Sequence, residues 1–263
     1  MPDHSALIAH WRAHGFDLPV DDPAAFYDAD YWSHDHKRLY PAVFPGGEIE
    51  VREYFPPAPE WHGFGIVLEG LWDALGEKPK TLLDVGCGCG SLVGHARRQG
   101  VNAVGVDVSR YAIEHPVPDA QGHTGLADVC EGIGGPAADV VTATDLMEHI
   151  HEVDLERVIS SLLRHAGQHL ALCICVARRP DEVWSHRQGE PVPLDRAWIA
   201  VSGHVTLRPF GWWENCFRCL GGQAFHTNWR AMHVFAQSWA LHPQLSQVAS
   251  WCPANILILS RSV

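Results

Sequence analysis

The sequence has no long apolar run and no N-terminal segment typical of an exported protein. A helix that crosses a membrane needs about 18 or more apolar residues in succession, and no such stretch is present. Residues 1–15 lack the basic segment followed by an apolar core that marks a signal peptide. These two absences exclude the usual signs of membrane insertion and export, and they favour a cytoplasmic protein.

Positive charge is also scarce. The chain has 19 Lys and Arg against 31 Asp and Glu, which gives a formal net charge of −12 with histidine neutral. Nucleic acids and anionic membranes are bound largely through Lys and Arg. The composition therefore argues against both as partners and favours a small molecule, while it says nothing about the oligomeric state.

Internal repeats and low-complexity segments are absent, so a solenoid or a disordered chain is not expected. The eight cysteines have no secretory signal beside them and are expected to be reduced thiols. The close pairs Cys173/Cys175 and Cys216/Cys219 leave a structural zinc open as an alternative. The first pair lies in an apolar segment, however, so buried free thiols are the preferred interpretation and no metal is assigned.

The most informative stretch that is present runs from residue 81 to residue 92. Residues 81–85 are short and apolar, which is typical of a parallel strand covered on both faces. Glycines follow at positions 86, 88 and 90, where the backbone needs unusual φ angles or a close approach to a ligand. The pattern is Asp-x-Gly-x-Gly-x-Gly, which differs from the dinucleotide-binding Gly-x-Gly-x-x-Gly because position 91 is Ser.

A second strand is predicted downstream, over residues 101–107. It ends in an acid, Asp107, which lies 23 residues after Asp84. A carboxylate at the tip of the second strand of a βαβ unit can accept hydrogen bonds from both hydroxyls of a ribose. NAD enzymes and other enzymes with adenosine-containing cofactors share that geometry, so Asp107 alone does not separate them.

Together these residues resemble motif I and the following acid of class I S-adenosylmethionine (SAM)-dependent methyltransferases of the small-molecule type. The resemblance covers about residues 75–263. It implies an α/β fold with a seven-stranded, doubly wound, Rossmann-like sheet, mostly parallel with an antiparallel last strand. It also implies SAM as the cofactor, with its amino-acid part above the glycine turn.

Further elements are expected in the order that this family shows. A helix capped by Asp154 should end at Gly167, and a fifth strand should cover residues 169–177. The last strand, residues 254–260, should lie antiparallel between the fifth strand and a sixth at residues 224–229. Ser109 is expected to cap a short helix over residues 110–115.

The resemblance implies a set of cofactor-binding positions. Asp84 would hold the amino group directly or through water, Asp107 the ribose, and Asp128 with the next backbone amide the adenine. For Asp128, a loop residue that caps a turn is the alternative. The full set is Asp84, Gly86, Cys87, Gly88, Gly90, Asp107, Val108, Asp128, Val129 and Asp145.

Candidate catalytic histidines follow the predicted fourth strand, residues 139–144. The segment 145–151 resembles the post-strand segment of the same family. His149 is the preferred general base, since it lies beside the expected methyl position and imidazole titrates near neutrality. His151 and His204 are alternatives, and each of the three is also open to a structural role.

A metal-assisted reaction is a further alternative. Asp145, Glu148, His149 and His204 resemble in type the two Glu and two His of small-RNA 3′-end methyltransferases, which bind a divalent metal. The acidic composition counts against RNA as the substrate. The preferred interpretation therefore has no metal.

The regions outside the motifs are predicted from composition. Residues 1–59 are expected to form a helical, aromatic-rich cap, either a lid over the acceptor site or an ordinary cap with its aromatics in the core. Residues 60–263 would form the SAM-binding core, with insertions at about 178–203 and 230–253.

The sequence as a whole predicts SAM-dependent methyl transfer to an oxygen or nitrogen of a small molecule, such as a sugar or a natural-product scaffold. Three alternatives stay open. They are an RNA- or nucleoside-modifying methyltransferase, an NAD-dependent oxidoreductase, and a protein that binds SAM without turnover.

Overall fold

The structure is a computed structural model that describes residues 23–27, 63–187, 190, 203–241 and 252–262. Most of the predicted N-terminal cap and parts of both predicted insertions lie outside these residues. None of the helices in the described part is long and apolar enough to cross a membrane.

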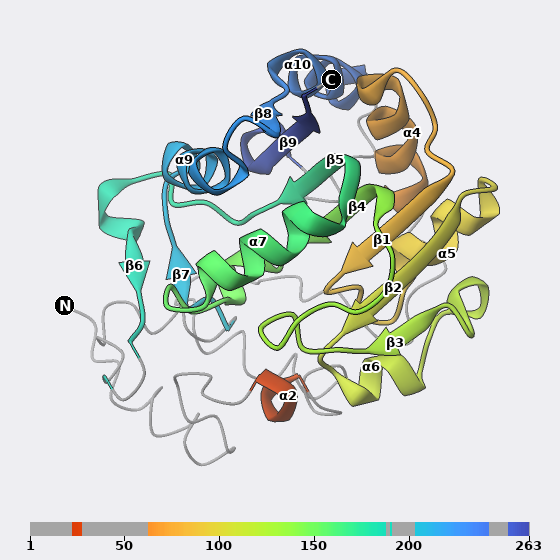
Figure 1. Cartoon of the computed structure of the whole chain (residues 1–263), viewed down its shortest axis with the longest axis horizontal. Coiled ribbons are helices and arrows are strands. Elements are labelled where there is room, and N and C mark those ends of the chain that lie inside the picture. Colours follow the sequence, from red (N-terminus) through yellow and green to blue (C-terminus); the bar gives the residue numbers. More distant parts are fainter. Residues whose placement is uncertain (1–22, 28–62, 188–189, 191–202, 242–251, 263) are drawn as a thin grey trace, which may run out of the picture.

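A seven-stranded sheet forms the centre of the molecule, in the order β3-β2-β1-β4-β5-β9-β8 (Figure 1). β9 pairs antiparallel with both β5 and β8, and the other pairs are parallel. The predicted fold class is thus confirmed, including the position of the last strand. The strands are β1 (Thr81–Val85), β2 (Asn102–Asp107), β3 (Thr124–Leu126), β4 (Ala138–Thr144), β5 (Ala166–Cys173), β8 (Phe225–Thr227) and β9 (Ile256–Arg261).

Helices cover both faces of this sheet because its strands carry apolar side chains on both sides. On one face, Leu68 and Phe235 pack with Leu82 of β1. On the other, Ile159 and Trp213 pack with strand residues such as Val141. The first layer contains α4 (Gly63–Leu75), α5 (Ser91–Arg98) and α10 (Trp229–Leu241), and the second contains α7 (Leu155–His165) and α9 (Phe210–Gly221).

Shorter elements complete the described part. A two-stranded sheet pairs β6 (Trp184–Ser185) with β7 (Thr206–Leu207). Most of the first predicted insertion between them lies outside the described residues. The remaining helices are α2 (Pro23–Phe26), α6 (Arg110–Glu114) and the single-turn 3₁₀ helices η2 (Pro118–Ala120), η3 (Met147–His149), η4 (Pro180–Glu182) and η8 (Pro253–Asn255).

α10 lies within the second predicted insertion, yet it packs as part of the fold. Ala231 and Phe235 are buried, and the helix lies against α4. The first half of that segment is therefore the helix that connects β8 to β9. Residues 242–251 lie outside the described residues.

The boundary between α7 and β5 differs from the prediction at Gly167. α7 ends at His165 and β5 begins at Ala166, so Gly167 is a strand residue and not the end of the helix. A Cβ atom on Gly167 would lie 2.8 Å from the Ala138 carbonyl oxygen of the neighbouring β4. The glycine is needed for the close approach of two strands, which a helix-stop interpretation cannot reveal. The fifth strand likewise ends at Cys173 and not at residue 177.

The parallel strands place their carboxyl ends at one edge of the sheet, where open α/β sheets bind ligands. The glycine turn after β1, the acid that ends β2 and η3 after β4 all lie at this edge. α2, the described piece of the N-terminal region, lies at the same edge (Figure 1).

Candidate active site

The glycine turn after β1 adopts a conformation that excludes most other residues. Gly86, Gly88 and Gly90 have φ angles of 75°, 53° and 78°, in the left-handed region. The backbone N–H groups of Gly86 and Cys87 donate to the Val106 carbonyl of β2 at 2.8 and 3.1 Å. The turn is therefore built against the second strand, and it leads directly into α5.

Asp107 connects this turn to the end of β2. Its carboxylate accepts the backbone N–H of Gly88 at 2.8 Å and that of Ser109 at 2.7 Å. Burial raises the pKa of Asp107, while these hydrogen bonds and one from the Val108 N–H favour the charged form. The acid thus orients the glycine turn and stands at the strand tip where the sequence predicts a ribose.

Asp84 is a buried acid beneath the turn. Its side chain is 3% exposed, and the hydroxyl of Thr142 on β4 donates to its Oδ1 at 2.8 Å. Burial raises the pKa of Asp84 to about 7; the Thr142 hydrogen bond opposes this shift and the charge of Asp107 adds to it. Asp84 is therefore a carboxyl group that lacks a positive partner in the part of the chain that the structure describes.

Cys87 fills the space between the turn and β2. It is 8% exposed, and a Cβ atom on Gly105 would lie 2.6 Å from the Cys87 Cβ. Burial raises the pKa of its thiol well above the usual value. All eight cysteines are free thiols, as the composition predicts. The Cys87 side chain is accordingly a packing group and not a nucleophile.

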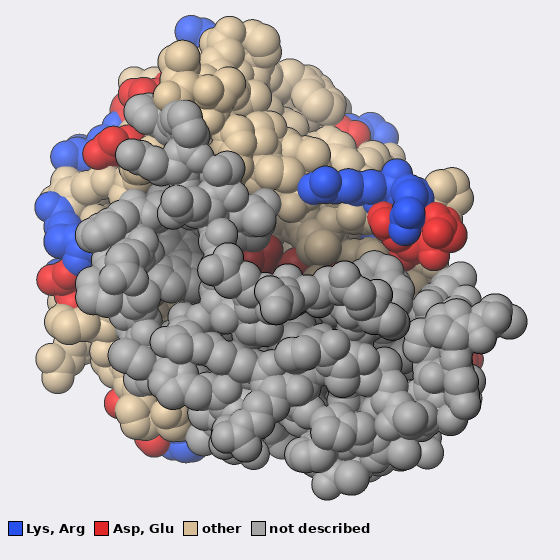
Figure 2. Space-filling view, turned by 180° about the vertical axis from the view of Figure 1, so that it is seen from behind, with Lys and Arg blue, Asp and Glu red and all other residues tan. Residues whose placement is uncertain are grey.

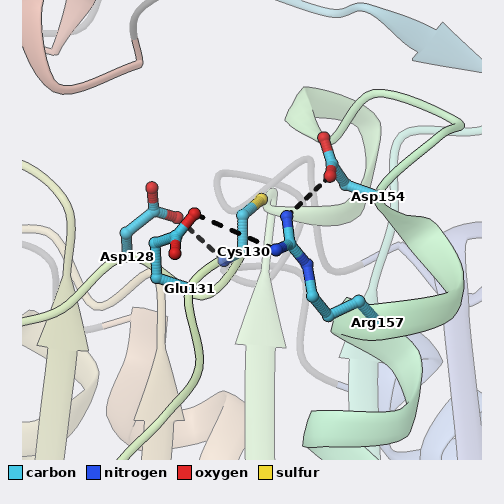
Figure 3. Close-up of polar contacts among 5 residues, drawn as sticks. All are labelled: Asp128, Cys130, Glu131, Asp154 and Arg157. Atoms are coloured by element: carbon cyan, nitrogen blue, oxygen red, sulfur yellow. Dashed lines mark hydrogen bonds and ion pairs between the residues drawn. The ribbon is translucent and has the colours of Figure 1, made fainter.

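The loop after β3 carries Asp128 and Val129. Asp128 accepts the backbone N–H of Cys130 at 2.8 Å, which is the turn-capping arrangement that the sequence left open. Figure 3 shows that this loop is connected to α7, because Arg157 is 2.7 Å from Asp154 and 3.9 Å from Glu131. Val129 is buried in the core. One carboxylate oxygen of Asp128 thus orders its own loop.

Asp145, directly after β4, has a strained backbone. Its φ of 49° is the only positive value at a non-glycine residue in the described part of the chain. The Asp145 N–H donates to the Cys173 carbonyl at 2.9 Å, which holds the residue at the end of β5. Such strain costs about 1–3 kcal/mol and is concentrated at functional sites. The exposed side chain lies at the carboxyl edge.

η3 brings together Glu148 and His149, and a distant segment adds His204. The Val205 N–H donates to the Glu148 carbonyl at 2.8 Å, so the chain after residue 203 runs alongside η3. The rings of His149 and His204 meet edge to face with centroids 4.9 Å apart. One ligand atom from each of Glu148, His149 and His204 lies within 4.8 Å of the others.

Burial controls the protonation of this group. It lowers the pKa of His149 to about 4, although the Gly203 carbonyl, 3.0 Å from Nδ1, favours the charged form. The pKa of His204 is also lowered well below its usual value, by burial and by His149. Burial and the negative charge of Asp145 raise the pKa of Glu148. Both imidazoles are therefore neutral at physiological pH.

Tyr27 contacts this group from the N-terminal region. Its hydroxyl lies 2.6 Å from His149 Nδ1, and the two rings meet edge to face. Its carbonyl accepts a hydrogen bond from the Ser109 hydroxyl after β2. Tyr27 thus spans the carboxyl edge from β2 to η3. This contact lies in the region predicted as an aromatic cap.

His151 does not join the group. It is buried with its ring 5.6 Å from that of His186, near Trp184 of β6. Of the three candidate catalytic histidines, the structure brings His149 and His204 together and places His151 in a different environment.

Comparison with known proteins gives a family for this arrangement. Residues 66–218, more than half of the chain, match the family described as a methyltransferase domain. The chain belongs to this methyltransferase family. Together with the class I fold, this makes it a SAM-dependent methyltransferase, with SAM as its cofactor.

Solved structures show the same fold at low sequence identity. The plantazolicin methyltransferase BamL, in complex with a triazolic desmethylPZN analog and SAH, is 14% identical with a TM-score of 0.51 over 77% of this chain and 86% of its own. Magnesium protoporphyrin IX methyltransferase (ChlM) from Synechocystis PCC 6803 with bound SAH is 16% identical with a TM-score of 0.49 over 89% and 97%. Curated proteins gave no significant match.

Two residues of the methyltransferase site were not predicted as site residues. Tyr27 is 122 positions from His149, so no local pattern connects them. Glu148 was considered only as a metal ligand, and its burial was not expected. Glu148 could have been identified from its position directly before His149, shortly after a buried strand. For Tyr27, the aromatic composition of its region was the one indication in the sequence.

Proposed function

We propose that this methyltransferase transfers the methyl group of SAM to an oxygen or nitrogen of a small molecule. The observation that carries this proposal is the contact of Tyr27, from the N-terminal region, with His149 beside His204 at the carboxyl edge. A site covered by the chain's own side chains admits a small acceptor more readily than a folded macromolecule. Sugars and natural-product scaffolds with polar and aromatic groups fit imidazole and phenol side chains.

The buried carboxyl group beneath the glycine turn fits the charge of the cofactor. A buried carboxyl group without a positive partner is costly, and an ammonium group beside Asp84 offsets that cost. We assign the amino group of SAM to Asp84, the ribose hydroxyls to Asp107 and Val108, and the adenine to Asp128 and Val129. The cofactor supplies a methyl group on a positively charged sulfur.

The protein's part in the reaction is to position and enclose the acceptor. Holding the two reactants in line accounts for about 7–11 kcal/mol of barrier lowering in favourable cases. The acceptor's lone pair would form the bond to carbon as the carbon–sulfur bond breaks toward sulfur, and the acceptor's proton would pass to solvent water. With a pKa of about 4, His149 is a weak base at neutral pH, so we assign His149 and His204 to the acceptor pocket.

An acidic surface disfavours the RNA alternative. The net charge is −12, and on the face shown in Figure 2 the Lys and Arg side chains of the described residues lie in separate groups, some beside acidic side chains. RNA binding draws on contiguous basic surface. A small molecule is therefore the better-supported acceptor.

Ligand binding and methyl transfer test the proposal together. The full chain is expected to bind SAH in calorimetry and to show no heat with NADH, because the turn lacks the pyrophosphate-binding pattern. Labelled SAM is expected to transfer its methyl group to members of a panel of phenols, sugars and amines but not to RNA. Binding of NADH alone, transfer to RNA, or SAM binding without transfer to any pool would overturn it.

The raised pKa of Asp84 predicts a pH dependence of cofactor affinity. In the free protein Asp84 is protonated below about pH 7, whereas a bound ammonium group favours the carboxylate. Binding then releases a proton, so SAH affinity is expected to rise with pH and to be about tenfold weaker at pH 6 than at pH 8. Calorimetry at both pH values measures this. D84N is the control, since it keeps the shape and cannot titrate. The same pH dependence in D84N would contradict the assignment.

A further inference from the structure

We propose that Glu148, His149 and His204 form a binding site for a divalent transition-metal ion. Glu148 and His149 come from η3 and His204 from the turn before β7, so the site forms only when these segments meet. Their ligand atoms lie within 4.8 Å of one another. Ligands about 2.1 Å from one ion lie at most about 4.2 Å apart, so small side-chain rotations suffice to close the site.

The strongest indication is an unsatisfied oxygen. Glu148 is fully buried; its Oε1 accepts the Cys175 N–H at 3.0 Å, but its Oε2 has no hydrogen-bond partner in the described part of the chain. Buried carboxylate oxygens are nearly always paired. A bound cation gives Oε2 its partner.

The two histidines are arranged as ligands. The Nδ1 atom of His149 is held by the Gly203 carbonyl at 3.0 Å and the Tyr27 hydroxyl at 2.6 Å, which leaves Nε2 to bind an ion. A metal-binding imidazole is commonly oriented in this way, through its other ring nitrogen.

The donor set selects the ion. Two imidazoles and one carboxylate suit zinc, cobalt, manganese or iron in the divalent state, whereas magnesium and calcium prefer sites made of oxygen alone. Three protein ligands leave positions open for another molecule.

The role of the ion rests on the proposed function. The proposed metal site lies beside Tyr27, at the His149/His204 pocket that we assign to the methyl acceptor. A divalent cation there lowers the pKa of a neighbouring hydroxyl and so favours its loss of a proton. The inference thus narrows the acceptor to an oxygen compound, such as a vicinal diol or a phenol.

The test uses cobalt and manganese as probes of the full chain after dialysis against a chelator. The protein is expected to bind one equivalent of Co²⁺, with the visible absorption of a nitrogen- and oxygen-ligated ion, and one of Mn²⁺ in calorimetry. E148Q keeps an acceptor for the Cys175 N–H and is expected to bind at least tenfold more weakly, since even outer contacts of a metal site change affinity about 10–100-fold. H204N is expected to do the same.

H115A, at an exposed histidine of the described surface, is the matched control and is expected to bind like the parent. SAH affinity, measured in parallel, shows that each variant is folded. Lack of stoichiometric binding by the parent, or equal binding by E148Q and H204N, would overturn the metal site. If the metal binds but SAH does not, the proposed function fails and the metal site stands.

Discussion

The G90A variant is expected to lose both stability and SAM binding. Gly90 caps the N-terminus of α5 with φ 78°, and a Cβ there would lie 2.6 Å from the Ala120 Cβ and 2.8 Å from Thr124 Cγ2. Left-handed strain and overpacking each cost about 1–3 kcal/mol. The expected loss is about 2–5 kcal/mol, or about 5–15 °C in Tm for a chain of this size.

G100A is the matched control for this prediction. Gly100 has φ 84°, yet nothing lies within 4 Å of its added Cβ. The G100A variant therefore introduces the left-handed strain without the steric clash. If packing decides the outcome, G100A lowers Tm far less than G90A does. Thermal unfolding of both variants, followed by SAH titration, measures the difference. Equal losses of Tm in G90A and G100A would mean that the contacts with Ala120 and Thr124 are not limiting.

Local patterns were sufficient for the features on which the cofactor site depends. The glycine turn follows a short apolar strand, and its glycines predict unusual φ angles or a close approach to a ligand. The structure shows left-handed φ angles at Gly86, Gly88 and Gly90. The last strand is recognisable from its apolar run, and its antiparallel position follows from the resemblance. Ser109 caps α6 as predicted, since its hydroxyl accepts the Ala112 N–H at 3.1 Å.

Features that depend on distant contacts were not predictable. From the sequence alone, Gly167 is interpreted as the end of a helix. The sequence does not show that the Ala138 carbonyl faces this residue across the sheet. The low pKa of His149 comes from burial, and its contacts with Tyr27 and Gly203 join segments far apart in the sequence. The imidazole is neutral, as a general base must be, but its low pKa makes it a weak base, and its role in catalysis stays a prediction. Sequence spacing identified the residue but not its environment.

The D107A variant is expected to weaken SAH affinity by about 1–3 kcal/mol, roughly 5–150-fold. Two effects contribute, because Asp107 is assigned to the ribose and also accepts the N–H groups of Gly88 and Ser109. Removal of the carboxylate leaves the turn less ordered and the ribose hydroxyls without a charged partner.

A ligand change separates these two effects of Asp107. Methylthioadenosine and its 2′,3′-dideoxy analogue differ only in the ribose hydroxyls, so titrating both into the parent and into D107A completes a double-mutant cycle. If Asp107 binds the ribose, the parent prefers the dihydroxy ligand and D107A loses that preference. If Asp107 acts through the turn alone, D107A weakens both ligands equally. D181A, at an exposed acid on η4, controls for the loss of one negative charge. A preference retained in D107A would remove the ribose assignment but leave the contacts of Asp107 with Gly88 and Ser109 as its role.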